Sequence, residues 1–151
     1  MNTSTDTYPA PTSSAHQLDR QPPVVAQHLT ESAVRRALAA IGLTGIALIH
    51  VLDLPGKLQE APYLGVAYLA LIGASLVAAE VLVRKDTVLA WLATGGIALS
   101  TLAGYIVNRT IGMPGAMDDI GNWLEPLGLA SLFVEGAVAA LALIGLTRRT
   151  R

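Results

Sequence analysis

The chain has 151 residues, about the length of one domain, with 52% hydrophobic and only 14% charged residues, against about 25% charged residues in typical globular proteins. Ten Lys and Arg against eleven Asp and Glu give a formal net charge of −1, which argues against nucleic-acid binding. The absence of cysteine excludes disulfides, cysteine-ligated metals, c-type haem and a cysteine nucleophile. This composition indicates a membrane protein with few catalytic groups.

Residues 1–30 differ from the rest of the chain because they are rich in Thr, Ser, Pro and Gln and contain no long apolar run. Such a segment buries too little apolar surface to offset the entropy of ordering, so we expect a disordered cytoplasmic tail. It also lacks a basic stretch followed by an apolar core, so it does not have the pattern of a signal peptide. We expect residues 31–151 to form the membrane domain.

Four apolar segments follow the tail, each near twenty residues long and almost free of charge. As helices they match a hydrocarbon core about 30 Å thick, whereas a soluble domain would need more polar surface to cover four such segments. The predicted fold class is therefore all-α, a transmembrane four-helix bundle with a disordered N-terminal tail. Short connections at 53–61 and 84–86 predict antiparallel neighbours. The predicted spans are about 34–54, 62–83, 87–107 and 126–147.

The cations are distributed unevenly over the connections. Eight of the ten Lys and Arg lie in the tail, the second connection and the C-terminus, and only Lys57 and Arg109 lie in the first and third connections. By the positive-inside rule, this distribution predicts a bacterial plasma-membrane protein with both termini in the cytoplasm. Tyr63, Tyr105 and Trp123 are then expected at the outer interface and Trp91 at the inner one, as an aromatic belt.

Small residues recur at helical spacing in three of the spans and predict close helix packing, because lipid gives apolar helices no hydrophobic reason to associate. The same stripes are compatible with dimerisation. The residues concerned are Gly42 and Gly45 in the first span, Gly96, Ser100 and Gly104 in the third, and Gly128, Ser131, Gly136 and Ala140 in the fourth.

Glu135 is a carboxyl group about 14 Å into the fourth span, near the centre of the bilayer. An ionised carboxylate is costly at that depth, so the group is protonated, paired or directed into a polar interior. Ser131, one turn earlier, and Gly128 place it on the bundle-facing side. A neutral Glu that forms a hydrogen bond between helices is the structural interpretation, and a proton or cation relay or a ligand contact is the functional one.

His50 is the only histidine inside a span, near the predicted outer surface, and Asp53 lies on the same helical face. The structural interpretation is an interfacial histidine with a hydrogen-bonded neighbour such as Tyr105. Ligation of copper with Asp53 or Glu60 is an alternative, although no diagnostic metal-binding spacing is present. A bis-histidine haem would require a dimer, because the other two histidines lie in the tail.

The third connection, residues 108–125, contains glycines and a proline typical of a shaped turn. Asp118 and Asp119 there predict a turn and helix cap or an acidic cation site. Arg109 is expected to pair with Glu125, Asp53 or Glu60 and so to close a cap over the outer end of the bundle. Thr94, Thr101 and Tyr105 form a polar stripe with Arg109 and predict a polar cleft. Trp123 in the connection is a further polar candidate. Glu80 is expected to pair with Arg84.

Several runs in the chain resemble those of small actinobacterial four-span integral membrane proteins. These runs are residues 105–115 (YIVNRTIGMPG), 123–128 (WLEPLG) and 131–135 (SLFVE), together with His50 and residues 62–65 (PYLG). The resemblance covers about residues 37–146 and implies four spans and an ordered third connection. No established activity accompanies the family, so the resemblance transfers no catalytic role.

The expected function is that of a non-enzymatic integral membrane protein, an accessory, sensing or partner-binding subunit with an outward-facing polar cap and no cofactor. Its expected partners are the lipid bilayer and a second copy or another membrane protein. One alternative is a redox membrane protein that binds copper or haem. The other is a proton-coupled conductor that uses Glu135.

Overall fold

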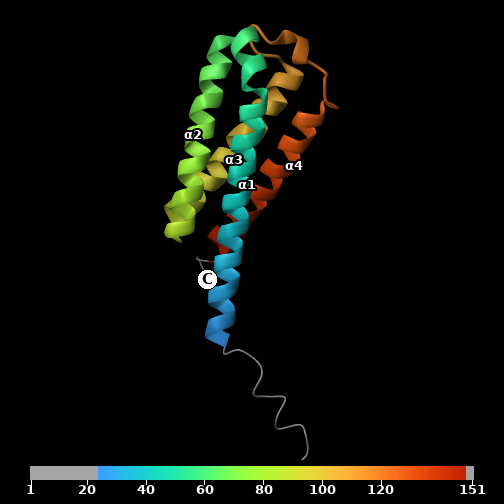
Figure 1. The fold of residues 1–151 in the computed structure, drawn as a ribbon. Coiled ribbons are helices and arrows are strands. Elements are labelled where there is room, and N and C mark those ends of the chain that lie inside the picture. The colour runs from blue at the N-terminus through green and yellow to red at the C-terminus, as the bar shows by residue number, and fades with distance from the viewer. Residues whose placement is uncertain (1–23, 149–151) are drawn as a thin grey trace, which may run out of the picture. The chain divides into compact units, whose positions relative to one another are not determined.

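The computed structural model describes residues 24–148 and confirms the predicted all-α four-helix bundle (Figure 1). The chain divides after Glu31, and apart from the beginning of α1 the features below belong to the second unit, of which residues 32–148 are described. No strand occurs in the described part of the chain. The elements are α1 (Val24–Glu60), α2 (Pro62–Arg84), α3 (Val88–Thr110), the 3₁₀ helix η2 (Met117–Asp119) and α4 (Pro126–Thr147).

Helix α1 is longer at each end than the sequence predicts. It begins at Val24, inside the segment expected to be disordered, while residues 1–23 lie outside the described part of the chain. A helix already nucleated by a long apolar span extends at little cost where no Gly or Pro interrupts it. At its other end α1 continues past residue 54, with Pro55 inside it, to Glu60. The first connection is therefore Ala61 alone and not residues 53–61.

All four helices are long and apolar enough to cross a membrane. Their outward faces carry large apolar side chains such as Ile41, Leu89 and Phe133, which are 68%, 75% and 78% exposed. Polar side chains, among them Thr94 and Glu135, are buried instead. An apolar outside with polar groups inside is suited to lipid, because lipid cannot satisfy hydrogen-bonding groups. The fold is that of a multi-pass membrane protein.

All four helices contribute to one core of mostly small residues, which includes Ala40, Ala78, Ala98 and Val138. Gly42 lies so close to Val138 that an added Cβ would be 2.4 Å from its Cγ2 atom. This packing of small residues supplies the close contact that apolar helices need in lipid.

Of the two predicted uses of the stripe of Gly96, Ser100 and Gly104, close packing within the bundle does not occur. A Cβ at Gly96 or Gly104 would meet no atom within 4 Å, and Ser100 is exposed. The neighbouring face of α3 packs instead, with Gly95 against Ala142. Consecutive helical positions are rotated by about 100°, so a regular spacing of small residues does not by itself select the packed face.

Trp91, predicted near the inner interface, is fully buried within the bundle in the first turns of α3. Its indole N–H donates to Asp86 (2.8 Å), and the guanidinium of Arg35 lies 5.7 Å from the ring centroid. Gly145 leaves the space that the ring occupies, because an added Cβ would lie 2.4 Å from ring atom Cδ2. A hydrogen-bond partner for the indole N–H, the partly buried Asp86, makes this core position possible. The predicted Glu80–Arg84 ion pair is present on the exposed face of α2.

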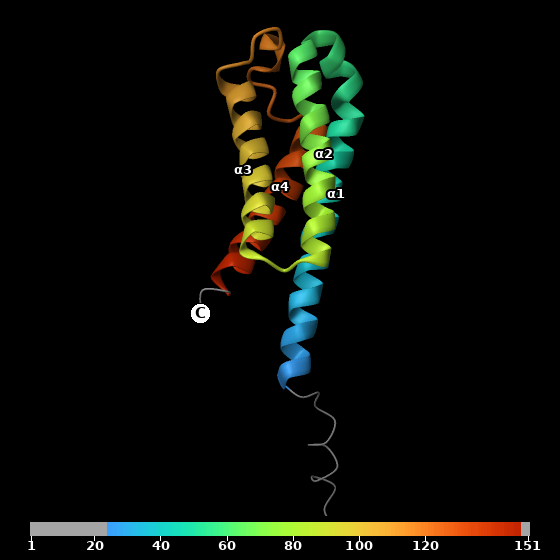
Figure 2. The same cartoon turned by 90° about the vertical axis from the view of Figure 1, so that its left-hand side faces the viewer.

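Residues 111–125, which we call the cap, form an ordered connection at the end of the bundle where α1 meets α2 (Figures 1 and 2). Gly112, Gly115 and Gly121 have φ angles of +83°, +84° and +78°, a region that glycine adopts without steric cost. Ala116 is buried with Ala61 and Leu64. These contacts fasten the cap to the junction of α1 and α2.

Candidate functional site

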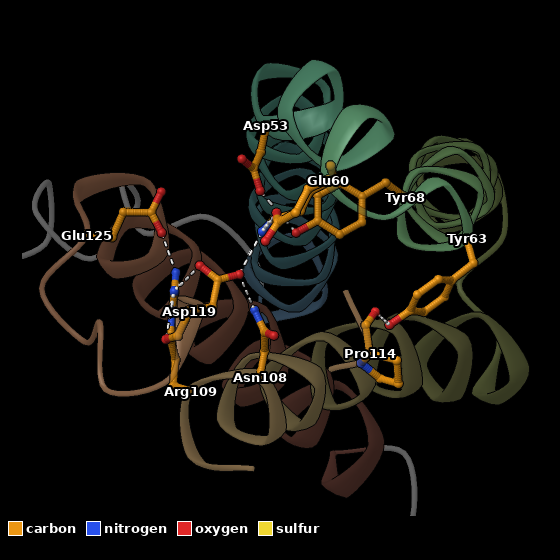
Figure 3. Close-up of polar contacts among 10 residues, drawn as sticks. Asp53, Glu60, Tyr63, Tyr68, Asn108, Arg109, Pro114, Asp119 and Glu125 are labelled. Atoms are coloured by element: carbon orange, nitrogen blue, oxygen red, sulfur yellow. Dashed lines mark hydrogen bonds and ion pairs between the residues drawn. The ribbon is translucent and has the colours of Figure 1, made fainter. Parts of the chain in front are cut away.

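The carboxylate of Asp119 joins the cap to two helices (Figure 3). Its Oδ2 atom accepts hydrogen bonds from Nζ of Lys57 on α1 and Nδ2 of Asn108 on α3, each at 2.7 Å. Its Oδ1 atom accepts from Nη1 of Arg109 at 2.6 Å. Both oxygens of one side chain are thus used to hold together segments that are far apart in the sequence.

Lys57 and Arg109 each have a second carboxylate partner. Lys57 also bonds to Glu60 at 2.7 Å, and Arg109 forms an ion pair with Glu125, one of the pairings expected from the sequence. The Arg109 guanidinium is buried and lies 5.2 Å from the ring centroid of Tyr105. The two cations and three carboxylates form one continuous network across the cap end of the bundle.

Asp119 is held as an anion by this network. Burial alone would raise the pKa of its carboxyl, but the hydrogen bonds from Lys57 and Asn108 and the charges of Lys57 and Arg109 outweigh it, so the pKa lies below its ordinary value. The network is therefore complete at neutral pH.

A cavity of about 290 Å³ lies among the four helices beneath the cap. It extends from Arg109 and Glu125 at the cap end to Ser131 and Glu135 on α4, and it brings six of the predicted site residues together. Those six are His50, Asp53, Tyr105, Arg109, Glu125 and Glu135, and Thr101 of the predicted polar stripe joins them; the other polar lining residues are Lys57, Tyr68, Ser100, Asn108 and Ser131.

Glu135 is 1% exposed and faces the interior of the bundle, as the sequence predicts. The hydroxyl of Ser131 donates to its Oε1 atom, so its partner is on the same helix and not on a neighbouring one as the structural interpretation expected. Its Oε2 atom is buried without a hydrogen-bond partner. One oxygen of this carboxyl group is therefore left for whatever occupies the cavity.

His50 is buried, and its Nδ1 atom lies 2.8 Å from the carbonyl oxygen of Ile46. Because a carbonyl only accepts, Nδ1 carries the proton, and Nε2 of the neutral ring is an acceptor. The aromatic neighbour of His50 is Tyr68, with ring centroids 4.7 Å apart, and not the expected Tyr105. The hydroxyl of Tyr105 instead donates to the carbonyl of Trp123 at 3.3 Å.

The metal candidates His50, Asp53 and Glu60 do not converge. Asp53 accepts from the hydroxyl of Tyr68 at 3.1 Å, and Glu60 is bound to Lys57. Within residues 24–148, no three His, Asp or Glu side chains are grouped so that they could hold a metal ion.

The remaining predicted residues lie around the cavity and do not line it. Asp118 is exposed on η2, and Trp123 is also exposed and packs edge-on against Tyr105. Of the polar stripe on α3, Thr101, Tyr105 and Arg109 line the cavity. Thr94 is buried outside it and donates to the carbonyl of Ala90 at 2.8 Å.

Sequence reasoning missed Lys57, Tyr68 and Asn108 as members of the site. Lys57 was assigned to a connection, although its spacing to Glu60 fits an ion pair on one helical turn. The signal for Tyr68 was its polarity within an otherwise apolar span, whereas Asn108 was assigned to the third connection and lies on α3. Comparison of the chain with protein-family models, curated proteins and solved structures finds no match, so the function is inferred from the cap and the cavity.

We expect Asp119→Asn to lower the free energy of unfolding by about 3 kcal/mol at pH 7, because it removes the anion that Lys57 and Arg109 share. Reversible unfolding in detergent, followed by circular dichroism, measures this loss. Asp118→Asn is the matched control, since Asp118 is exposed on the same turn, and it should change stability by less than about 0.5 kcal/mol.

The loss caused by Asp119→Asn should also depend on pH. Because the folded-state pKa is lowered, the contribution of the carboxylate is complete above the unfolded-state value of about 3.9 and disappears as the pH falls through the folded-state value. A difference between wild type and Asp119→Asn that is as large at pH 2 as at pH 7 would contradict this assignment.

Proposed function

We propose that the chain is a non-enzymatic membrane protein that binds a small ligand in the cavity beneath the cap and acts as a sensing or accessory subunit. The observation that carries this proposal is a cavity of about 290 Å³ whose lining includes Glu135, a buried residue with one carboxyl oxygen, Oε2, that has no hydrogen-bond partner. Small-molecule sites are typically concave, with largely apolar walls and a few placed polar groups, and measure about 300–1,000 Å³. This cavity is near the lower end of that range and suits a compact ligand.

The walls of the cavity have the mixed character that such a site needs. Ile49, Leu64, Leu71 and Leu127 supply apolar surface, while the polar groups lie at the cap end and at Glu135. The apolar walls favour burial of a ligand, and the polar groups fix its orientation.

The cap gives ligand binding a means of changing the outer surface. Lys57, Asn108 and Arg109 line the cavity and also hold the Asp119 carboxylate. A ligand that displaces any of these three side chains therefore changes the hold on the cap. This shared use of residues supports a sensing role over simple storage of a ligand.

We also propose that the cap faces the outside of a bacterial plasma membrane, because eight of the ten Lys and Arg lie before residue 37, at the connection of α2 and α3, or at the C-terminus. The chain has no cysteine, so a single introduced thiol reports its own location. A thiol at the exposed position Asp118 should react with a membrane-impermeant maleimide in intact cells. One at Lys85 should react only after permeabilisation, and the reverse pattern would contradict the orientation.

Ligand binding is tested by filling the cavity from Gly104, which lines it and has open space where a side chain would project. A fragment library of alcohols, carboxylates and amines is screened by ligand-observed NMR against the purified chain in nanodiscs. Fragments that bind the wild type should bind Gly104→Leu at least tenfold more weakly.

The matched control is Gly96→Leu, on the same helix, also with open space for a side chain and outside the cavity lining. It should retain the fragments that Gly104→Leu loses. Equal binding to both variants, or no binding to the wild type, would contradict the proposed function.

A further inference from the structure

The hydroxyl groups that line the cavity have already donated their protons within the protein. Ser131 donates to Glu135, Tyr68 to Asp53, and Tyr105 to the carbonyl of Trp123. Each of these oxygens therefore offers only lone pairs to the cavity. The hydroxyls make the cavity a surface of acceptors.

Further acceptors on the lining have no partner. Oε2 of Glu135 and Oδ1 of Asn108 are buried without a hydrogen bond, and Nε2 of a neutral His50 is an acceptor because Nδ1 donates to Ile46. Among the described lining residues, the one buried donor without a partner is Nε of Arg109. The lining therefore requires an occupant that mainly donates.

The charges lead to the same conclusion. Lys57 is paired with Glu60 and Asp119, and Arg109 with Asp119 and Glu125. Neither cation is left to neutralise Glu135, which is 1% exposed. A carboxylate buried at this depth requires a positive partner or a proton.

We propose that the ligand of this cavity, the ligand on which the proposed function rests, is a small primary amine bound as its ammonium ion. An ammonium group has three donors and no acceptor, and its charge complements the Oε2 atom of Glu135. The aromatic rings of Tyr68 and Tyr105 also line the cavity and suit a cation. The alkyl part of the amine lies against the aliphatic walls.

The test is calorimetric titration of the full chain in nanodiscs with n-butylammonium chloride. n-Butanol and sodium butyrate serve as neutral and anionic probes of similar size. We expect saturable binding of n-butylammonium and binding of the other two at least tenfold weaker. Glu135→Gln should weaken n-butylammonium binding at least tenfold. Glu80→Gln, which removes an exposed carboxylate from another span, should leave it unchanged.

Binding of n-butylammonium that is unaffected by Glu135→Gln would overturn the inference. Binding of n-butanol or butyrate as tight as that of n-butylammonium would also overturn the inference. If Gly104→Leu then abolished this binding, the cavity would still be a ligand site and the proposed function would stand. If Glu135→Gln does not fold, n-butylammonium binding is measured with Gly104→Leu instead, and Gly96→Leu is the control. Loss of n-butylammonium in the first variant alone supports the inference, and retention in both overturns it.

Discussion

The carboxylate of Asp119 is the interaction on which the cap end of the bundle depends. It lies between Lys57 and Arg109, which are on different helices, and it accepts a further hydrogen bond from Asn108. Each cation also binds a second carboxylate, so every charged group in the partly buried network is paired. Buried charges are stable only when they are paired and hydrogen-bonded. This arrangement meets that condition and fixes the cap above the cavity.

Glu135 is subject to the same physical constraint and meets it differently. In the Asp119 network every charged group has a partner, whereas at Glu135 one oxygen accepts from Ser131 and the other has none. Glu135 is also one of the residues that line the cavity beneath the cap. The Asp119 network, in which every charged group is paired, is the structural part of the site. Glu135, which has one oxygen without a hydrogen-bond partner, is the part available for binding.

The fold follows from the sequence because the length and apolarity of each span are local properties. The inward direction of Glu135 was likewise predictable from Ser131 and Gly128 on the same face. The network was not, since Lys57 and Asp119 are 62 residues apart and meet only after α1 continues beyond Pro55. The burial of Trp91 depends on the space left by Gly145, which no helical pattern reveals.

Hydrogen exchange of the cap amides most directly tests the role of Asp119. The amide of Gly121 donates to the carbonyl of Arg109 at 2.9 Å and so reports whether the cap stays in place. In Asp119→Asn we predict at least tenfold faster exchange at this amide and at its neighbours in residues 111–125. Amides in the middle of α3 and α4 should be unchanged. Cap exchange as slow as in the wild type would contradict the conclusion that Asp119 holds the cap.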